Sequence, residues 1–180
     1  MIGVEVRVVN EQDCDVGPGE VGEIIVRGDN VTPGYWNKPA ETAAALRNGW
    51  LRTGDLATAD EDYYLTIVDR KKDMIISGGE NIYSIEVEAA LYAHPAVLEA
   101  AVIAVPDPKW GERVHAVIVV KPGQSATPEE LVAFCRERIA GFKTPRSIEF
   151  VDTLPKSGAG KILKRELRAK HWQAEARLVS

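Results

Sequence analysis

Cysteines, histidines and long apolar runs are scarce in this chain of 180 residues. The two cysteines, Cys14 and Cys135, are far apart and have no metal-ligand spacing, so we expect reduced thiols in a cytoplasmic protein. His94 and His115 also lie at no spacing typical of a metal site, and we expect both to be structural and no metal to be bound. No apolar run has the roughly 20 residues that span a bilayer, and residues 1–9 lack the apolar core of a signal peptide.

The chain also lacks a positive charge balance, because 22 Lys and Arg face 27 Asp and Glu for a net charge of −5. Nucleic-acid-binding domains are usually basic, so nucleic acid is excluded as a partner, whereas small basic clusters can still bind phosphates. An apolar share of 45% and a charged share of 27% are normal for a globular protein. The length fits one ordinary domain or two small modules.

Residues 1–69 show the pattern of a β-rich unit. Apolar and polar residues alternate over 4–9 and a second strand follows over 22–27, with turn-forming residues between them, which predicts a hairpin. We expect a short helix over 40–46, a turn over 50–55 and a strand over 63–68. Three aromatic residues are expected to pack rather than to bind a ligand: Tyr35, Trp36 and Trp50.

After Asp73 helices and strands alternate, which predicts an α+β domain of about a hundred residues. Ser84 is expected to cap a helix that ends near Ala93 before Pro95. Thr127 and Glu130 form a capping box at the start of a helix that Gly141 is expected to end. The other expected elements are strands over 97–105, 115–120 and 147–151, and a final helix carrying Leu163, Leu167 and Trp172.

Three motifs occur in order: Trp50–Asp55, Asp69–Asn81 and Pro155–Lys161. Together they strongly resemble the carboxyl-terminal part of an acyl-CoA synthetase of the adenylate-forming (AMP-binding) superfamily, over about residues 22–172. The resemblance implies that residues 1–69 end a large N-terminal domain and that 70–72 form a hinge. Residues 73–180 would then be the mobile C-terminal α+β domain, a small mixed sheet with flanking helices.

The resemblance assigns the nucleotide contacts to Asp55 and Arg70. Asp55 would hold the ribose hydroxyls of ATP and of the acyl-adenylate, although on the motif alone an Asp that caps its own turn is the more frequent case. Arg70 would reach the same ribose and phosphate. Lys72 occupies the hinge position, where one backbone site absorbs large dihedral changes while the small domain swings between two poses.

Lys161 is the residue that the resemblance makes catalytic. The segment around it is not a P-loop, because Pro155 replaces the first glycine and Ile162 the Ser or Thr. In the adenylate-forming family the corresponding lysine enters the active site during adenylation. An ammonium on a glycine-rich loop can neutralise charge where the carboxylate meets the α-phosphate.

The resemblance also implies a second, CoA-binding face. Gly78 and Gly79 would lie beside the pantetheine arm, since a residue without Cβ allows close approach. Aromatic and cationic side chains would stack on adenine or hold phosphates. The residues assigned to CoA are Gly78, Gly79, Trp110, Phe142, Lys143 and Arg146, while Thr144 stands where some relatives carry a further basic residue.

The implied activity is that of a carboxylic acid:CoA ligase, with fatty or aromatic acids as the expected class. ATP and the acid give an acyl-adenylate and pyrophosphate, and CoA then gives acyl-CoA and AMP. We find no phosphate-binding loop or acyl pocket, so Mg²⁺, ATP and acid would depend on an N-terminal portion and this chain alone would be inactive. Two alternatives remain: a stand-alone CoA- or protein-binding module, and an adenylation domain that loads a carrier protein, although no carrier segment precedes Ser180.

Overall fold

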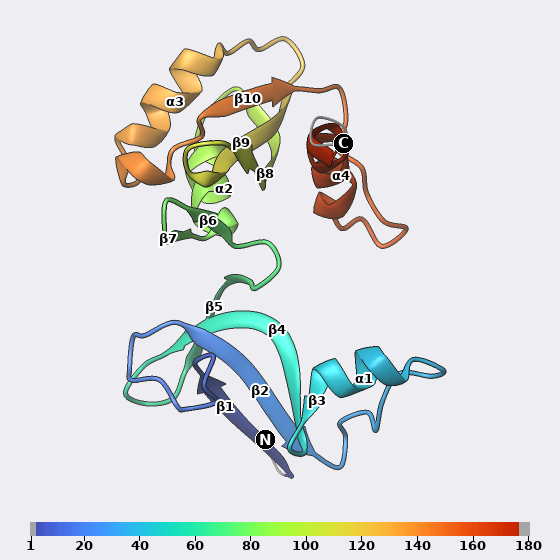
Figure 1. The fold of residues 1–180 in the computed structure, drawn as a ribbon. Helices are drawn as coiled ribbons and strands as arrows, with labels where there is room; N and C mark the ends of the chain where they lie inside the picture. Colours follow the sequence, from blue (N-terminus) through green and yellow to red (C-terminus); the bar gives the residue numbers. More distant parts are fainter. Residues whose placement is uncertain (1–2, 177–180) are drawn as a thin grey trace. The chain divides into compact units, whose positions relative to one another are not determined.

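The computed structural model describes residues 3–176, and the side chains of these residues as far as Trp172. The chain divides into two compact units, Met1–Lys72 and Asp73–Ser180. Each unit has its own five-stranded sheet (Figure 1). Among the described residues, no helix is both long enough and apolar enough to cross a membrane.

The first unit is a β-sheet with one short helix. Its strand order is β1 (Val4–Val9), β2 (Gly22–Gly28), β4 (Trp50–Ala59) and β3 (Leu46–Arg47), with β5 (Leu65–Arg70) also paired to β4, and the helix is α1 (Pro39–Ala45). The predicted hairpin is confirmed, because β1 and β2 pair antiparallel from Val4 opposite Gly28 to Val9 opposite Glu23. The turn predicted over 50–55 is wrong, since these residues begin the long strand β4.

The aromatic residues of this unit divide into two groups. Trp50 packs beneath the guanidinium of Arg27, 4.5 Å from the ring centre, as a packing role predicts. Tyr35 and Trp36 are 51% and 94% exposed, so the packing predicted for them is absent from the described unit. Both lie in the loop between β2 and α1 and not on a strand, so their side chains do not belong to a sheet face.

The second unit is a mixed sheet with helices on both faces. Its strands are β6 (Ile75–Ser77), β7 (Glu80–Ile82), β8 (Val97–Asp107), β9 (Gly111–Val120) and β10 (Ser147–Phe150), and its helices are α2 (Ser84–Tyr92), α3 (Pro128–Arg136), the 3₁₀ turn Gly141–Lys143 and α4 (Lys164–Ala176). β10 runs parallel to β9, whereas β8 and β6 run antiparallel to it. The predicted α+β class is confirmed.

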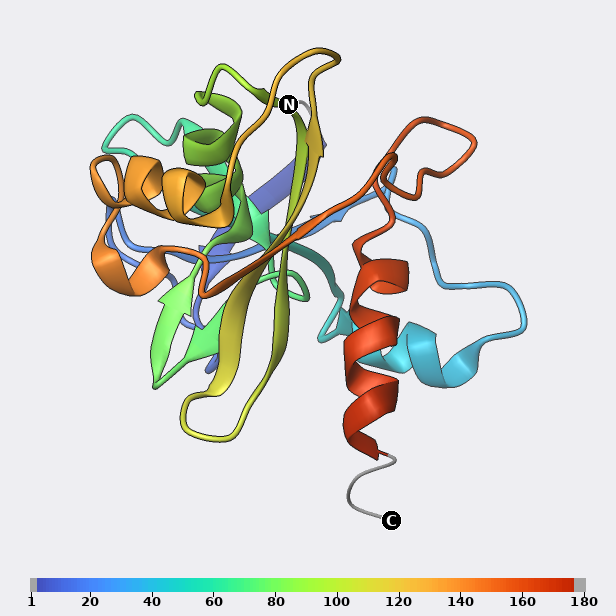
Figure 2. The same cartoon turned by 90° about the horizontal axis from the view of Figure 1, so that it is seen from above.

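Both faces of the β8–β9 pair are buried, which explains the continuous apolar run over 97–105. Alternate residues of β8 (Ala100, Val102 and Ala104) pack with α2 and α3, whereas Ala101, Ile103 and Val105 pack with Leu167 of α4. Figure 2 shows α2 and α3 on one side of these strands and α4 on the other. The sheet therefore separates two apolar clusters, and α4 covers the second.

Two expected helix ends differ from the structure for tertiary reasons. Thr127 forms the predicted capping box, with its hydroxyl accepting from the Glu130 amide. Ser84 does not cap α2, because its buried hydroxyl accepts a hydrogen bond from Lys164 Nζ at 2.7 Å and Tyr83 takes the cap position. α3 ends at Arg136, and Gly141 instead begins the 3₁₀ turn.

Candidate functional site

The two residues expected to hold the ribose lie together in the first unit. Asp55 and Arg70 face each other across the β4–β5 ladder, and Arg70 Nε lies 3.1 Å from Asp55 Oδ1. Their side chains are 32% and 55% exposed, so both remain open to solvent. A carboxylate with a second free oxygen and a guanidinium with further donors form a site that suits a diol next to a phosphate.

A buried carboxylate that sequence reasoning missed holds this segment in place. Glu23 is 6% exposed and accepts hydrogen bonds from Arg52 at 2.6 Å, from Lys71 at 3.3 Å and from the Gly54 amide at 3.3 Å. Arg52 also contacts Asp13. A buried charge needs such pairing, and the pairing fixes the backbone of β4 at Gly54, whose φ of 75° suits glycine. The sequence signal was a Glu at an inward position of a strand.

The two glycines expected near CoA form the turn of the β6–β7 hairpin. Gly78 and Gly79 have φ of 62° and 88°, a pair of left-handed residues that makes a type I′-like turn. A Cβ on Gly78 would lie 2.7 Å from Trp110 Cε3, whereas nothing lies within 4 Å of a Cβ on Gly79. The Gly78 amide also donates to the Trp110 carbonyl at 2.9 Å. The structure therefore brings Gly78 and Trp110 into direct contact.

Trp110 is held by its own loop and flanked by cations. Asp107 accepts hydrogen bonds from the amides of Lys109 and Trp110 at 2.9 and 3.0 Å. The hydrogen bond from the Lys109 amide is the main cause that holds the pKa of Asp107 below its usual value, and the Trp110 amide adds to it. Lys109 Nζ and the Arg146 guanidinium carbon lie 4.6 and 5.1 Å from ring centres of Trp110. The indole and the exposed Arg146 form one surface with aromatic and cationic character.

Phe142 and Lys143 lie in the 3₁₀ turn before β10, and they differ in availability. Phe142 is 44% exposed. Lys143 Nζ lies 2.7 and 2.8 Å from the two oxygens of Glu86 on α2, so its charge is already paired. Thr144 is buried and donates to the Gly141 carbonyl at 2.7 Å. Of the two cations in this segment, the exposed Arg146 is therefore more available than the paired Lys143 to bind a phosphate.

Lys161 lies on a hairpin loop between β10 and α4. The Ser157 amide donates to the Lys161 carbonyl at 2.8 Å, the Lys161 amide donates to Ser157 Oγ at 3.2 Å, and Gly160 has a φ of 77°. The Lys161 side chain is exposed, and within the described residues no carboxylate pairs with it. By contrast, Lys164, three residues on, is paired with Glu88 at 2.7 Å. An ordered loop therefore presents the Lys161 side chain to solvent.

Together, a small mixed α+β unit, a Gly-Gly hairpin against an indole and a lysine on a Gly-rich loop define the C-terminal domain of an AMP-binding enzyme. Residues 86–161 match the family described as "AMP-binding enzyme C-terminal domain". The chain belongs to this family as the C-terminal part of an adenylate-forming enzyme, which confirms the predicted resemblance.

Named relatives are ligases that are longer than this chain. A feruloyl-CoA synthase from Amycolatopsis is 54% identical over 91% of this chain and 33% of its own length. A long-chain-fatty-acid–CoA ligase from Bacillus subtilis is 56% identical over 83% of this chain and 27% of its own. The solved structure of o-succinylbenzoate CoA synthetase from Bacillus subtilis with an acyl-adenylate is 40% identical, with a TM-score of 0.86 over 93% of this chain and 34% of its own. This chain thus spans about a third of these relatives.

Proposed function

We propose that this chain is the C-terminal part of an ATP-dependent carboxylic acid:CoA ligase, with long-chain fatty acids or related carboxylates as substrates. Asp55 and Arg70 hold the ribose and phosphate of ATP and of the acyl-adenylate. Lys161 supplies positive charge while the carboxylate attacks the α-phosphate and pyrophosphate leaves. The thiol of CoA then attacks the acyl carbon and AMP is released. Both steps depend on orientation and electrostatics, without a protein nucleophile.

The observation that carries the proposal is the separation, on one unit, of the two loops that carry the residues expected to face CoA and the acyl-adenylate. The β6–β7 hairpin and the loop that precedes α4 lie on different sides of the second unit (Figures 1 and 2). A single acyl-adenylate cannot meet both at once, so rotation of the unit about Lys72 explains their joint presence. In one pose Lys161 completes the adenylation site. In the other pose Gly78, Gly79, Trp110 and Arg146 guide CoA, with Phe142 and Lys143 at its nucleotide.

The rest of the site belongs, in this proposal, to an N-terminal portion that binds Mg²⁺, the β- and γ-phosphates and the acid. Exposed apolar side chains of the first unit support it, because Trp36, Tyr63 and Tyr64 are 94%, 86% and 73% exposed. Such side chains are typical of surfaces that another part of a protein covers. We place the enzyme in the cytoplasm, where ATP and CoA are available.

The test separates the two half-reactions in the complete enzyme. Lys161→Met is expected to abolish acid-dependent exchange of pyrophosphate into ATP, while acyl-CoA still forms from added acyl-adenylate and CoA. Trp110→Ala is expected to do the reverse. Loss of both half-reactions in both variants would contradict two poses. The isolated chain is expected to release no pyrophosphate from ATP and acids, and steady release would contradict the need for an N-terminal portion.

A further inference from the structure

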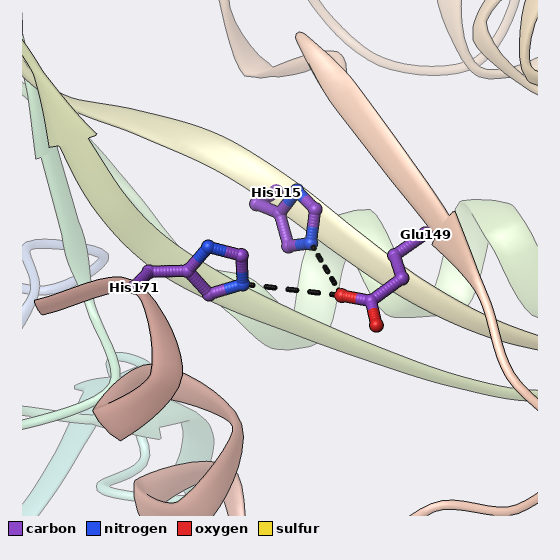
Figure 3. A group of neighbouring side chains, drawn as sticks. All are labelled: His115, Glu149 and His171. Carbon is purple, nitrogen blue, oxygen red and sulfur yellow. Dashed lines mark ion pairs between the residues drawn. The ribbon is translucent and has the colours of Figure 1, made fainter. Parts of the chain in front are cut away.

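A cluster of three side chains joins α4 to the sheet of the second unit, away from the residues discussed above. It consists of His115 on β9, Glu149 on β10 and His171 on α4. Figure 3 shows both imidazole rings turned toward the same oxygen of Glu149, with His115 Nε2 at 3.7 Å and His171 Nε2 at 3.9 Å. These separations exceed a normal hydrogen bond. The three groups therefore converge without bonding one another directly.

The imidazole of His115 is oriented by a partner on its other nitrogen. His115 Nδ1 lies 2.7 Å from Ser147 Oγ. With Nδ1–H donating to Ser147, the lone pair of Nε2 points to Glu149 and His171. The His115 side chain is only 7% exposed, and within the described residues its Nε2 has no hydrogen-bond partner. A buried nitrogen without a partner is costly, and a metal ion would satisfy it.

The distances between the candidate ligand atoms would suit a small divalent cation once the three side chains move slightly closer together. Nitrogen and carboxylate ligands at about 2.1 Å from zinc lie about 3.4 Å apart in a tetrahedral site. The two printed separations of 3.7 and 3.9 Å are close to this value. All candidate ligand atoms lie within 4.8 Å of one another, so the largest possible contraction is about 1.4 Å. Glu149 and His171 are 39% and 30% exposed, which leaves these side chains room to move.

The ligand types and their support are those of a zinc site. Two imidazoles and one carboxylate form a known zinc ligand set, with the fourth position left to water. A hydrogen bond on the non-ligating nitrogen, as between His115 Nδ1 and Ser147 Oγ, is the usual outer support of a metal-binding histidine. The neighbouring cation Arg113 forms an ion pair with Asp107 at 3.8 Å. Because Asp107 is the partner of Arg113, the Glu149 carboxylate is left to offset the charge of the metal ion.

We propose that His115, Glu149 and His171 bind a Zn²⁺ ion that fastens α4 to β9 and β10. Because α4 begins three residues after Lys161, the ion would stiffen the base of the lysine loop. The proposal differs from the expectation that His115 is structural and has no metal partner. Glu149 lies 34 residues after His115, and His171 lies 22 residues after Glu149. No local spacing motif could therefore reveal the three ligands.

The test is a Zn²⁺ titration of the 180-residue chain against a chromophoric chelator, in a Cys14→Ser background because the exposed Cys14 thiol is itself a zinc ligand. One equivalent is expected to bind. His171→Ala and Glu149→Gln should each weaken binding at least about tenfold, and Ser147→Ala about tenfold through the orientation of His115. The matched control is His94→Ala, because His94 packs on Phe134 outside the cluster and should leave the affinity unchanged.

Two further measurements keep the result independent of folding defects. Circular dichroism must show folded variants, and Co²⁺ in place of Zn²⁺ should give the intense visible bands of a four- or five-coordinate site. Zn²⁺ should raise the melting temperature of the background protein and of His94→Ala, but not of His171→Ala. Equal affinity in His171→Ala and the background protein, or an equal loss in His94→Ala, would overturn the proposal.

Discussion

Asp55 on β4 lies directly opposite Arg70 on β5, with Arg70 Nε 3.1 Å from the Asp55 carboxylate. The two residues lie on consecutive strands, and an irregularity between Leu56 and Ala57 shifts the register of the ladder beside them. The pair therefore holds a hydrogen-bond acceptor and a cation side by side, as the proposed nucleotide contact requires.

We expect Arg70→Ala to separate nucleotide binding from stability. The pair is partly exposed, and such pairs contribute about 0–1 kcal/mol, so the free energy of unfolding should change by no more than that. In the complete enzyme the KM for ATP should rise several-fold. The control is Arg27→Ala, which breaks the exposed pair with Glu5 in the same sheet and should leave the KM unchanged. An equal effect of both variants on KM would contradict the assignment.

Gly78→Ala should be more damaging than Gly79→Ala. Both glycines have positive φ, so each substitution costs about 1 kcal/mol of backbone strain. Only at Gly78 does the new Cβ also meet Trp110 at 2.7 Å, which should add roughly 1 kcal/mol or more from displacing a packed ring. Hydrogen exchange of peptides from β8 and β9 in rising urea measures the difference. Equal losses would show that Trp110 moves away freely.

Substitution by methionine is expected to destabilise the fold at Lys164 and to leave its stability nearly unchanged at Lys161. Lys164 and Glu88 are each 15% exposed and 2.7 Å apart, and Glu88 also accepts from the Val102 amide. Lys164→Met removes the Lys164 cation from this mostly buried carboxylate and should cost about 2 kcal/mol or more. Lys161→Met, on the exposed loop, should change stability by less than about 0.5 kcal/mol.

The same pair of variants gives a kinetic contrast in the complete enzyme. Lys161→Met should lower the adenylation rate by orders of magnitude in a protein of normal stability. Lys164→Met should leave the adenylation rate of the folded fraction within a few-fold of normal. A destabilised Lys161→Met protein would refute the proposed division of roles.

The two thiols should differ in reactivity. Cys14 is exposed, whereas Cys135 is buried, and burial raises the pKa of the Cys135 thiol. One thiol should react rapidly with Ellman's reagent at pH 8 in the native chain, and two in denaturant. In Cys14→Ser the native chain should show no rapid reaction. Fast labelling of both native thiols would contradict the buried position.

The raised pKa of Cys135 also has a consequence for stability. Burial of the neutral Cys135 thiol makes a contribution to the free energy of unfolding that is fully present below the pKa of the unfolded thiol, about 8.5. Above that pH the unfolded thiol ionises first, so the contribution is lost as the pH rises toward the folded pKa. Urea midpoints between pH 7 and pH 10 should therefore fall less in Cys135→Ala than in the native chain, although this variant starts from a lower value because it leaves a cavity.

Local patterns in the sequence were sufficient where neighbours in sequence are also neighbours in space. The hairpin of β1 and β2 and the capping box of Thr127 are both local, and both are confirmed. The motifs were also sufficient to identify the family, because several of their residues are needed for a particular backbone conformation or for exposure.

The predictions that failed required long-range information. Ser84 looks like a helix cap, but a lysine 80 residues away takes its hydroxyl. The CoA contact of Lys143 stays a prediction, and its ion pair with Glu86 on another element could not be read from the sequence either. The inward position of Glu23 likewise became meaningful only with Arg52 and Lys71 beside it. In each case a polar group found its partner through the fold rather than through spacing.

α4 also has a consequence for the order of synthesis. Asp73, the first residue of the second unit, is 12% exposed and accepts from Arg168 of α4 at 2.6 Å. A ribosome makes Arg168 almost a hundred residues after Asp73. The ion pair between the first residue of the unit and its last helix can therefore form only after α4 has been synthesised. A nascent chain that stalls before α4 would carry Asp73 without this cation and the sheet face at Ala101, Ile103 and Val105 without its cover. Such a chain would be a substrate for chaperones until α4 emerges.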